Sequence, residues 1–350
     1  MSDPSRSDVP SPPGDDVPLV PVRLRPDYRR RLWGGNVLPE WLGGEPPPGD
    51  EPVAEAWVAH GGSVIMDGPW HGRTVDDLIA RVGPAVVGEA SVARYGARMP
   101  LLAKFLDAAD DLSVQVHPND AYARAHHPGS GHLGKTESWR IVHAEPGARV
   151  VWGVSRPMQP ERLRRAAEEG AIGTLLRSVP VASGQLIHNP AGTVHAVGAG
   201  SRLYELQQAS DLTYRLWDYR RKGADGRPRE LHLTAALEVA DLSGRGEPFV
   251  PPRPGADGWT QRVACPFYLL EELATDQDAG RVVDATTLAD DGAQLHLLTV
   301  LNGSFRLTGQ GTEPPMTLPE GATALVPAAY GAYRLHGRGT VLRGRTGPAG

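Results

Sequence analysis

Four side chains able to bind a metal ion are spread over three short, separated segments of the chain. Gln115 and His117 alternate in the first segment, Glu137 ends the second, and His195 ends the third. Residues i and i+2 of a β-strand point to the same face, so Gln115 and His117 can both point inward. Residues this dispersed meet around one ion only if separate strands each direct a side chain inward. The pattern therefore predicts a barrel-like β fold with an internal metal site.

Composition limits the kind of metal site and the class of protein. The single cysteine, Cys265, excludes an intramolecular disulfide and a cluster of thiolates, which leaves nitrogen and oxygen ligands. Two imidazoles, a carboxylate and an amide suit a borderline divalent metal and can leave a position for substrate. The formal charge of −5 argues against nucleic-acid binding. Because the chain lacks a long apolar run and a signal-peptide pattern, we expect a cytoplasmic protein with no membrane partner.

The expected elements are mainly short strands, because 42 glycines and 33 prolines make the chain rich in turns. Residues 1–18 contain almost nothing apolar, and we expect a disordered leader there. Strands are predicted at 112–117, 138–143, 149–154, 295–300, 304–307 and 323–326. Helices are predicted after a capping box at Thr74, over 160–169, and over 230–240. The chain is thus expected to be mostly β with a small α-helical insert.

One spacing occurs twice. Residues 184–195 have the pattern G-x5-P-x-G-x2-H, and residues 321–327 repeat its G-x5-P part. In the second copy, Ala329 and Ala332 stand in the places of the second glycine and the histidine. The repeat indicates two related halves, one with metal ligands and one without. Chance is the alternative, because glycine and proline are frequent in this chain.

The run 184–195 also resembles the second signature of the cupin superfamily, whose fold is a double-sheet jelly roll. The first signature of a cupin supplies His-x-His and a later carboxylate, and Gln115, His117 and Glu137 fill these places here. The resemblance implies two cupin-like jelly-roll β-barrel halves with a small α-helical insert. The expected division is an N-terminal catalytic domain at 19–240 and a C-terminal cupin-like β domain at 241–350 that lacks metal ligands.

A more specific resemblance links the chain to the type I phosphomannose isomerases. It is carried by motifs in chain order: LWGG (32–35), AKFLDA (103–108), LSVQVHPND (112–120), GKTE (134–137), PAGTVHA (190–196) and QQASDLTYRLWDY (207–219). One departure lies near the N-terminus, where the family usually has Gly-Glu-Ser/Cys-Trp and residues 54–57 are AEAW. The resemblance implies an isomerase that interconverts mannose 6-phosphate and fructose 6-phosphate and holds one Zn2+ per chain.

Matched position by position, the family motifs assign roles to individual residues. They make His117, Glu137 and His195 zinc ligands and Arg215 the active-site arginine. Gln115 is either the fourth ligand or a hydrogen-bonding partner of the ligands, because a neutral amide binds metal weakly. These assignments are what the resemblance implies.

An aldose–ketose isomerase needs a base, a group that stabilises an enediolate, and a site for the phosphate. Arg215 is always cationic, so it can stabilise the enediolate or bind phosphate. The alternative for Arg215 is an ion pair with Asp211 or Asp218.

Three further charged residues are candidates for the same chemistry. Lys135 lies two residues before a carboxylate ligand, hence on the same strand face, and is a candidate base or phosphate ligand. Its alternative is a solvated lysine at the end of a strand. Glu205 is a proton-transfer candidate or a structural partner of Arg215. Lys104 either reaches the phosphate or pairs with Asp107.

Two other functions use the same ligand set. Two histidines and a carboxylate also form the facial triad of iron-dependent cupin oxygenases. A non-catalytic sugar-binding cupin is the other alternative. Lys135 and Arg215, at the positions that match the isomerase family, favour the isomerase. Its partner would be a small sugar phosphate, and we expect a monomer or a homodimer.

Overall fold

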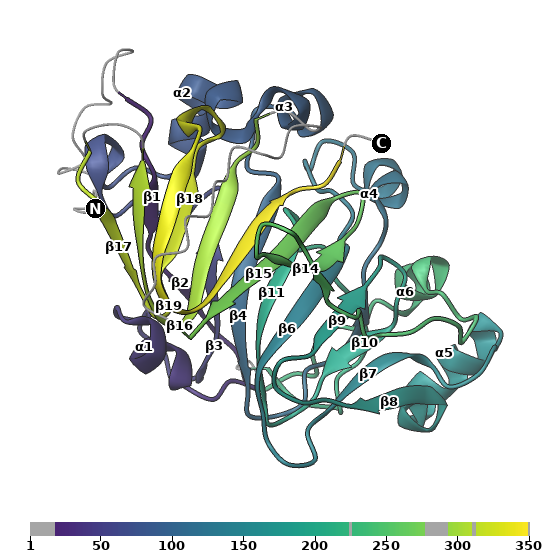
Figure 1. Ribbon diagram of the computed structural model, residues 1–350. Coiled ribbons are helices and arrows are strands. Elements are labelled where there is room, and N and C mark those ends of the chain that lie inside the picture. Colours follow the sequence, from purple (N-terminus) through teal and green to yellow (C-terminus); the bar gives the residue numbers. More distant parts are fainter. Residues whose placement is uncertain (1–17, 224–225, 277–292, 310–312, 349–350) are drawn as a thin grey trace, which may run out of the picture.

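The computed structural model describes residues 18–223, 226–276, 293–309 and 313–348. The leader expected at 1–18 therefore lies outside the described residues, except for Pro18. In the described part the strands form three sheets (Figure 1). The strands of these sheets outweigh the helices, so the prediction of a mostly β protein is confirmed.

The six-stranded sheet forms one wall of the candidate site. Its antiparallel order is β2-β3-β4-β11-β6-β9, with β2 Asp27–Arg30, β3 Val53–Ala59, β4 Leu101–Ala108, β11 Ser201–Gln208, β6 Glu137–Ala144 and β9 Leu186–Asn189. Every residue of β4 is buried, including Lys104. A buried charge is costly unless it is paired, so Lys104 needs carboxylate partners in the interior.

The five-stranded sheet forms the opposite wall. Its antiparallel order is β12-β5-β10-β7-β8, with β12 Tyr214–Trp217, β5 Val114–Val116, β10 His195–Val197, β7 Arg149–Val154 and β8 Leu176–Pro180. The strand predicted at 112–117 is shorter, because Pro118 has no N–H for pairing and β5 ends at Val116. Trp139 of one sheet and Trp152 of the other lie in a single core between the two walls.

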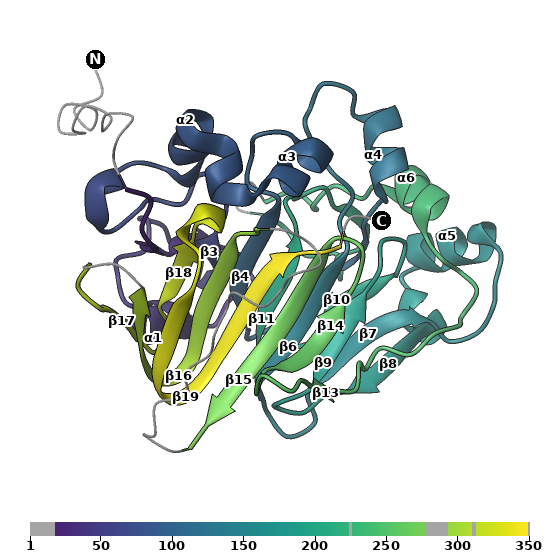
Figure 2. The same ribbon diagram turned by 45° about the horizontal axis from the view of Figure 1, so that its top comes forward.

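An eight-stranded sheet packs on the other face of the six-stranded sheet (Figure 2). Its order is β1-β18-β16-β19-β15-β14-β13 with β17 on β16, and the bounds are β1 Val22–Leu24, β13 Arg253–Pro254, β14 Thr260–Ala264, β15 Tyr268–Thr275, β16 His296–Gly309, β17 Met316–Pro319, β18 Thr323–Val326 and β19 Tyr333–Thr346. Leu206 of β11 and Leu342 of β19 lie in the apolar layer between the two sheets. Val22 of β1 pairs with Leu325 of β18, so the two are joined across most of the sequence.

Helices cover the sheets at their edges and outer faces. The described residues contain α1 Val37–Leu42, α2 Val75–Val87, α3 Glu89–Tyr95, α4 Asp120–His126, α5 Pro160–Glu169 and α6 Leu233–Val239, with 3-10 turns η2 Gly68–Trp70, η3 Ile172–Leu175 and η4 Ala328–Tyr330. α5 and α6 pack through Leu163 and Ala236 on the outer face of the five-stranded sheet. No helix in the described ranges is long and apolar enough to cross a membrane.

Two of the predicted helices match the structure closely. The capping box at α2 is formed, since Thr74 Oγ1 accepts from Asp77 N at 3.1 Å and Asp77 Oδ2 accepts from Thr74 N at 3.0 Å. α5 has the predicted bounds and ends at Gly170, whose left-handed φ of 79° favours glycine. The helix predicted at 230–240 is shorter, at Leu233–Val239. α1, α3 and α4 lie outside the ranges predicted to be helical.

The repeated glycine–proline spacing has a common local structure. Gly184 and Gly321 both have a positive φ, and each precedes a four-residue strand, β9 or β18. Pro190 and Pro327 come directly after the last residue of those strands. After Pro190 the chain reaches the candidate ligand His195, whereas after Pro327 it forms the turn η4. The two segments thus share a turn, a strand and a proline, and they diverge only beyond the proline.

Candidate metal centre

Strand pairing places the candidate ligands side by side. In the five-stranded sheet, Gln115 of β5 lies opposite His195 of β10 on one side and Arg215 of β12 on the other. Directly paired residues of antiparallel strands point to the same face, so these three side chains form one row. The facing wall contributes Glu137 from β6 and Glu205 from β11. The charged groups of the site thus come from both walls of the sandwich.

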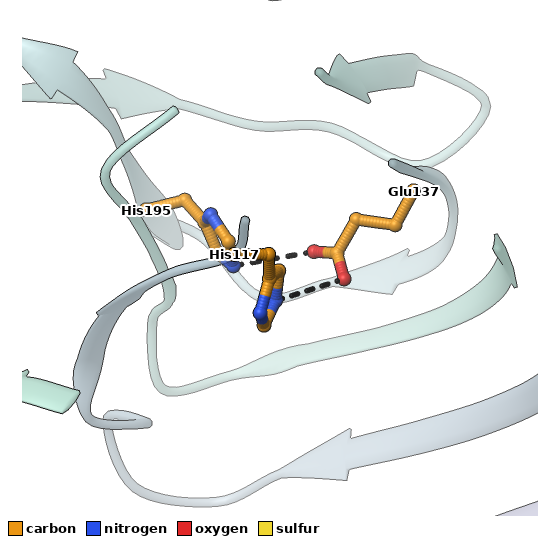
Figure 3. A group of neighbouring side chains, drawn as sticks. All are labelled: His117, Glu137 and His195. Atoms are coloured by element: carbon orange, nitrogen blue, oxygen red, sulfur yellow. Dashed lines mark ion pairs between the residues drawn. The ribbon is translucent and has the colours of Figure 1, made fainter. Parts of the chain in front are cut away.

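His117, Glu137 and His195 converge in space (Figure 3). His117 Nε2 lies 3.3 Å from Glu137 Oε2, and His195 Nε2 lies 3.3 Å from Glu137 Oε1. One possible ligand atom from each residue lies within 4.8 Å of the others, and each residue is only 1% exposed. This group can therefore hold one metal ion in a site shielded from water.

Backbone carbonyls fix the orientation of both imidazoles. His117 Nδ1 donates to Leu212 O at 2.9 Å, and His195 Nδ1 donates to Thr193 O at 2.8 Å. A carbonyl oxygen only accepts, so the proton of each neutral ring is on Nδ1 and Nε2 carries a lone pair. This is the arrangement by which proteins hold metal-binding histidines. Both Nε2 atoms lie beside Glu137, and that of His117 also accepts from Lys135 Nζ at 3.0 Å.

The protonation states of the three residues also suit a metal. Burial, and next the adjacent ammonium of Lys135, lower the pKa of His117 to about 3, and burial lowers the pKa of His195. Burial alone would raise the pKa of Glu137, but Lys135 and the two histidines hold it well below its ordinary value. At neutral pH the group offers two neutral nitrogens and one carboxylate, which are the forms that bind metals.

Gln115 reaches the same centre. Its Nε2 lies 3.3 Å from His195 Nε2, and the side chain lines the cavity beside the histidines. Amide nitrogen and oxygen are assigned from the hydrogen-bond network and can be exchanged by rotating the amide. The same position therefore lets the amide oxygen point to a metal or the amide nitrogen bond to one of its ligands.

Lys135 and Glu205 extend the centre by a second pair of charges. Lys135 Nζ lies 2.8 Å from Glu137 Oε2 and 3.6 Å from Glu205 Oε1. Lys135 is 3% exposed, so it is a buried residue of the site and not a solvated lysine at a strand end. Burial, and next the charge of Glu137, raise the pKa of Glu205 to about 8. A carboxyl group with this pKa can carry a proton at neutral pH.

Lys104 finds its partners in the same network. Its Nζ lies 3.5 Å from Glu55 Oε2 and 3.7 Å from Glu205 Oε1. These two carboxylates raise the pKa of Lys104 against the effect of its burial. Asp107, the partner considered from sequence, instead accepts from Val37 N at 3.0 Å. Lys104 and Lys135, and not Arg215, are therefore the cations next to Glu205.

A cavity of about 490 Å³ opens in front of these residues. Its other charged lining residues include the guanidinium groups of Arg31, Arg215 and Arg229. Arg215 Nη1 donates to the backbone oxygen of Glu230 at 2.8 Å, and burial together with Arg229 lowers the pKa of Arg215. The ion pair with Asp218 considered from sequence belongs instead to Arg229, at 3.3 Å, and to a second arginine. The positively charged Arg215 and Arg229 are thus neighbours in one part of the cavity.

Sequence reasoning did not assign Arg31, Glu55 or Arg229 to the cavity. Glu55 is a charged residue within β3, a strand that is otherwise apolar. This is a local signal that would have identified Glu55 as a candidate site residue. Arg229 has no comparable local signal, because its place depends on Asp218, eleven residues earlier in the chain. Position in the fold, and not pattern, brings Arg229 to the cavity.

The sequence is similar to known isomerases. Residues 22–137 match the family model for the catalytic domain of type I phosphomannose isomerase. The mannose-6-phosphate isomerase ManA of Bacillus subtilis is 41% identical over 226 residues, which are 63% of this chain and 68% of that protein. The mannose-6-phosphate isomerase of Streptococcus mutans is 35% identical over 294 residues, which are 82% of this chain and 87% of that protein.

The fold is similar to solved structures of mannose 6-phosphate isomerases. A crystal structure of the mannose 6-phosphate isomerase of Bacillus subtilis has a TM-score of 0.80 and 28% identity, and the match covers 93% of this chain and 99% of that chain. A zinc-bound mannose 6-phosphate isomerase has a TM-score of 0.71 and 18% identity, over 94% of this chain and 100% of that chain, and shares the fold. The sequence identity to proteins matched over most of their length shows that the chain belongs to the type I phosphomannose isomerase family.

Proposed function

We propose that this chain interconverts mannose 6-phosphate and fructose 6-phosphate as a metal-dependent aldose–ketose isomerase. Its family and the relatives named mannose-6-phosphate isomerase support the activity. The observation that carries the proposal is that Nε2 of His117 and of His195 meet Glu137 at a cavity of about 490 Å³ rich in charge. A cavity of that size accommodates a small sugar phosphate.

Zn2+ suits the donor set of His117, Glu137 and His195. The two nitrogen–oxygen separations of 3.3 Å are close to the edge of about 3.4 Å expected around tetrahedral zinc with bonds of 2.0–2.1 Å. We assign Gln115 as the fourth protein ligand, with a hydrogen bond to His195 as the alternative. The bound metal would polarise the sugar oxygens and stabilise negative charge on them.

Lys135 and Glu205 are the residues to which we assign proton transfer. The isomerisation moves a proton between C1 and C2 of the sugar, so a group on one face must accept it and return it. Both side chains line the cavity next to Glu137, and Lys135 Nζ lies 3.6 Å from Glu205 Oε1. Because the pKa of Glu205 is raised to about 8, this carboxyl can gain or lose a proton near neutral pH.

Arg215 and its neighbours form the anion-binding part of the cavity in this proposal. Arg215 would stabilise the enediolate, whose negative charge develops during proton transfer. Arg229 and Arg31, which also line the cavity, would bind the phosphate. The planar guanidinium group suits phosphate because it can form two parallel hydrogen bonds. The adjacent cations disfavour one another when the cavity is empty of an anion, and a phosphate would relieve this repulsion.

We further infer that residues 19–240 and 241–350 are two cupin-like jelly-roll halves, with the metal in the first. The sandwich of the six-stranded and five-stranded sheets supports the first half, and the eight-stranded sheet supports the second. The shared turns at Gly184 and Gly321 support a common origin. β1 is the exception to this division, because it pairs with β18 of the second half.

A metal-dependent assay tests the proposed function. We expect the purified protein to produce mannose 6-phosphate from fructose 6-phosphate, to lose this activity in EDTA, and to regain it with Zn2+. Oxygen consumption with Fe2+ and no sugar-phosphate turnover would instead indicate the iron-dependent oxygenase. Metal binding without turnover of any hexose 6-phosphate would indicate a non-catalytic sugar-binding cupin.

A further inference from the structure

The strand β6 has two functional faces. Glu137 and Trp139 point into the space between the six-stranded and five-stranded sheets, where Trp139 lies 5.4 Å from His195, ring centre to ring centre. Ser138 and Arg140 alternate with them and therefore point the other way, toward the eight-stranded sheet. The layer on that side is otherwise largely apolar. Polar contacts within it therefore stand out.

A hydroxyl pair links the two sheets directly behind the metal centre. Ser138 Oγ lies 2.9 Å from the hydroxyl of Tyr268 on β15 and 2.9 Å from His188 Nδ1 on β9. Ser138 and Tyr268 are both 0% exposed. Ser138 comes directly after Glu137 in the chain, so this contact fixes the peptide next to the metal-binding carboxylate.

Two residues further along β6, an ion pair again links β6 to β15. Arg140 Nε and Nη2 donate to Glu272 Oε2 and Oε1 at 2.7 and 3.0 Å, a bidentate arrangement. Arg262 lies 3.5 Å from Glu272 Oε2 and donates to Gly184 O at 2.7 Å. Glu272 of the eight-stranded sheet is thereby tied both to β6 and to the turn before β9.

We propose that Tyr268 and Glu272 of β15 are positioning residues for Glu137 of the metal centre. They act through Ser138 and Arg140, which hold the back of β6. Apolar packing tolerates small shifts of one sheet over another, whereas buried hydrogen bonds have one favourable geometry. Loss of a group bonded directly to a metal ligand typically changes metal affinity by about 10- to 100-fold, and these contacts, one step further out, should lie at the lower end of that range. The inference rests on the proposed metal site and gives the C-terminal sheet a role in it.

A pair of tyrosine variants tests the inference. Tyr268→Phe removes the hydroxyl that contacts Ser138, and Tyr333→Phe removes a similarly buried hydroxyl that lies 2.9 Å from His296 Nδ1 on the other face of the eight-stranded sheet. Each variant loses one buried hydrogen bond, so a purely structural role predicts the same fall in Tm for both. We expect only Tyr268→Phe to weaken Zn2+ binding, by roughly tenfold in competition with a chelator. We also expect only Tyr268→Phe to change the visible absorption of the Co2+-substituted protein.

A second matched pair uses neighbouring residues of β15. Glu272→Gln disturbs the contact with Arg140, whereas Glu271→Gln disturbs the contact with Arg343 on the opposite face of the same strand. The Co2+ spectrum should change in Glu272→Gln and stay as in wild type in Glu271→Gln. This pair, measured well below the Tm of both variants, keeps the test valid if one tyrosine variant folds poorly.

Two results would overturn the inference, and they differ in what else they remove. Unchanged Zn2+ affinity and an unchanged Co2+ spectrum in Tyr268→Phe and Glu272→Gln, with an active wild type, would remove the positioning role alone. A wild type that binds no Zn2+ at His117, Glu137 and His195 would remove the proposed metal site together with it.

Discussion

Two buried clusters of charge in the described part of the chain differ in the groups that surround their carboxylates. In the eight-stranded sheet, Glu271 Oε2 accepts from Arg343 Nε at 2.9 Å and from Arg345 Nε at 3.2 Å, and Arg343 lies 4.2 Å above the ring of Trp259. His296 in the same region lies 2.9 Å from a tyrosine hydroxyl. At the metal centre, Nε2 of both imidazoles lies 3.3 Å from one carboxylate, that of Glu137.

This difference separates a structural cluster from a functional one. Buried carboxylates and histidines in a protein core are expected to be hydrogen-bonded, as Glu271 is. At the metal centre, two imidazole nitrogens lie 3.3 Å from Glu137, and Lys135 Nζ lies 2.8 Å from it. Guanidinium groups have no lone pair to offer a metal, whereas neutral imidazoles and a carboxylate do. Burial and charge alone would not distinguish the two clusters, whereas the kinds of group around each carboxylate do.

Loss of a proposed metal ligand should have the largest effect on activity. The matched substitution in the other cluster should leave activity unchanged. We expect His195→Ala to lose bound Zn2+ and to lower kcat/KM by about 1000-fold or more, because metal stabilisation of the transition state amounts to several kcal/mol. His296→Ala, the matched histidine of the other cluster, should keep both metal and activity and lose only stability. Metal analysis and a coupled isomerase assay check both variants. Retained activity in His195→Ala would contradict the functional role that distinguishes the metal centre from the other cluster.

Removal of an arginine from each cluster should give the next largest effect. We expect metal-replete Arg215→Ala to lower kcat by about 100-fold or more, as loss of a group that stabilises a developing anion does. Arg345→Ala should lower the Tm through the loss of its contact with Glu271 and leave kcat near that of wild type. A full complement of Zn2+ with an unchanged rate in Arg215→Ala would contradict the role assigned to it.

Acid should weaken the fold through buried histidines on the two faces of the eight-stranded sheet. Burial lowers the pKa of His188 to about 4 and holds that of His296 well below its ordinary value. The unfolded chain takes up these protons near pH 6.5 and the folded chain does not, so stability is complete above about pH 6.5 and falls toward pH 4. The slope is at most about 1.4 kcal/mol per pH unit for each histidine.

Urea unfolding of EDTA-treated protein at pH 7 and pH 5 measures this effect. We expect His188→Asn and His296→Asn each to reduce the difference in unfolding free energy between the two pH values. If neither substitution reduces it, the acid sensitivity arises from other buried groups whose pKa is lowered, such as His117, His195 and Glu271.

The smallest effect is expected at a site remote from both clusters. Thr74→Ala removes the side chain that caps α2 and should lower the unfolding free energy by about 1 kcal/mol. Isomerase kinetics and metal content should stay as in wild type. This variant shows how far a loss of stability alone alters activity, and it serves as the baseline for the larger effects. A change in kcat comparable to that of Arg215→Ala would show that activity follows stability in general.

The candidate ligands can be found from sequence because their signal is local. Gln115 and His117 alternate by the strand period, and the motifs around Glu137 and His195 set each residue beside recognisable turns. The helix at 160–169 is likewise marked at both ends, by Pro160 and Gly170. Such signals depend on a few neighbouring residues and do not require knowledge of the fold.

Features that depend on distant partners cannot be predicted in this way. Asn302-Gly303 has the composition of a hairpin turn, and the sequence predicts a strand on either side of it. The structure instead contains one continuous strand, β16, with an irregularity after Val300. Gly303 is required there, because a Cβ would lie 2.0 Å from Arg338 O of β19. Pairing with β19, and not the local sequence, determines that this segment of β16 forms a bulge and not a turn.

The charge pairs of the cavity are non-local in the same way. Glu55 and Lys104 are 49 positions apart and meet only because β3 and β4 are neighbours. From sequence, Lys104 is equally able to pair with Asp107, which is near in the chain but lies on a different face of β4. The residue types that can carry charge are visible from sequence, and their partners are not.

The pairing of β1 with β18 has a consequence for synthesis of the protein. Val22 leaves the ribosome long before Leu325, the residue opposite it. Until then the edge of β1 has no strand to satisfy its backbone groups, and an open edge invites association with other nascent chains. Expression of a fragment that stops before β18 should therefore yield aggregates, even though such a fragment would carry every proposed metal ligand.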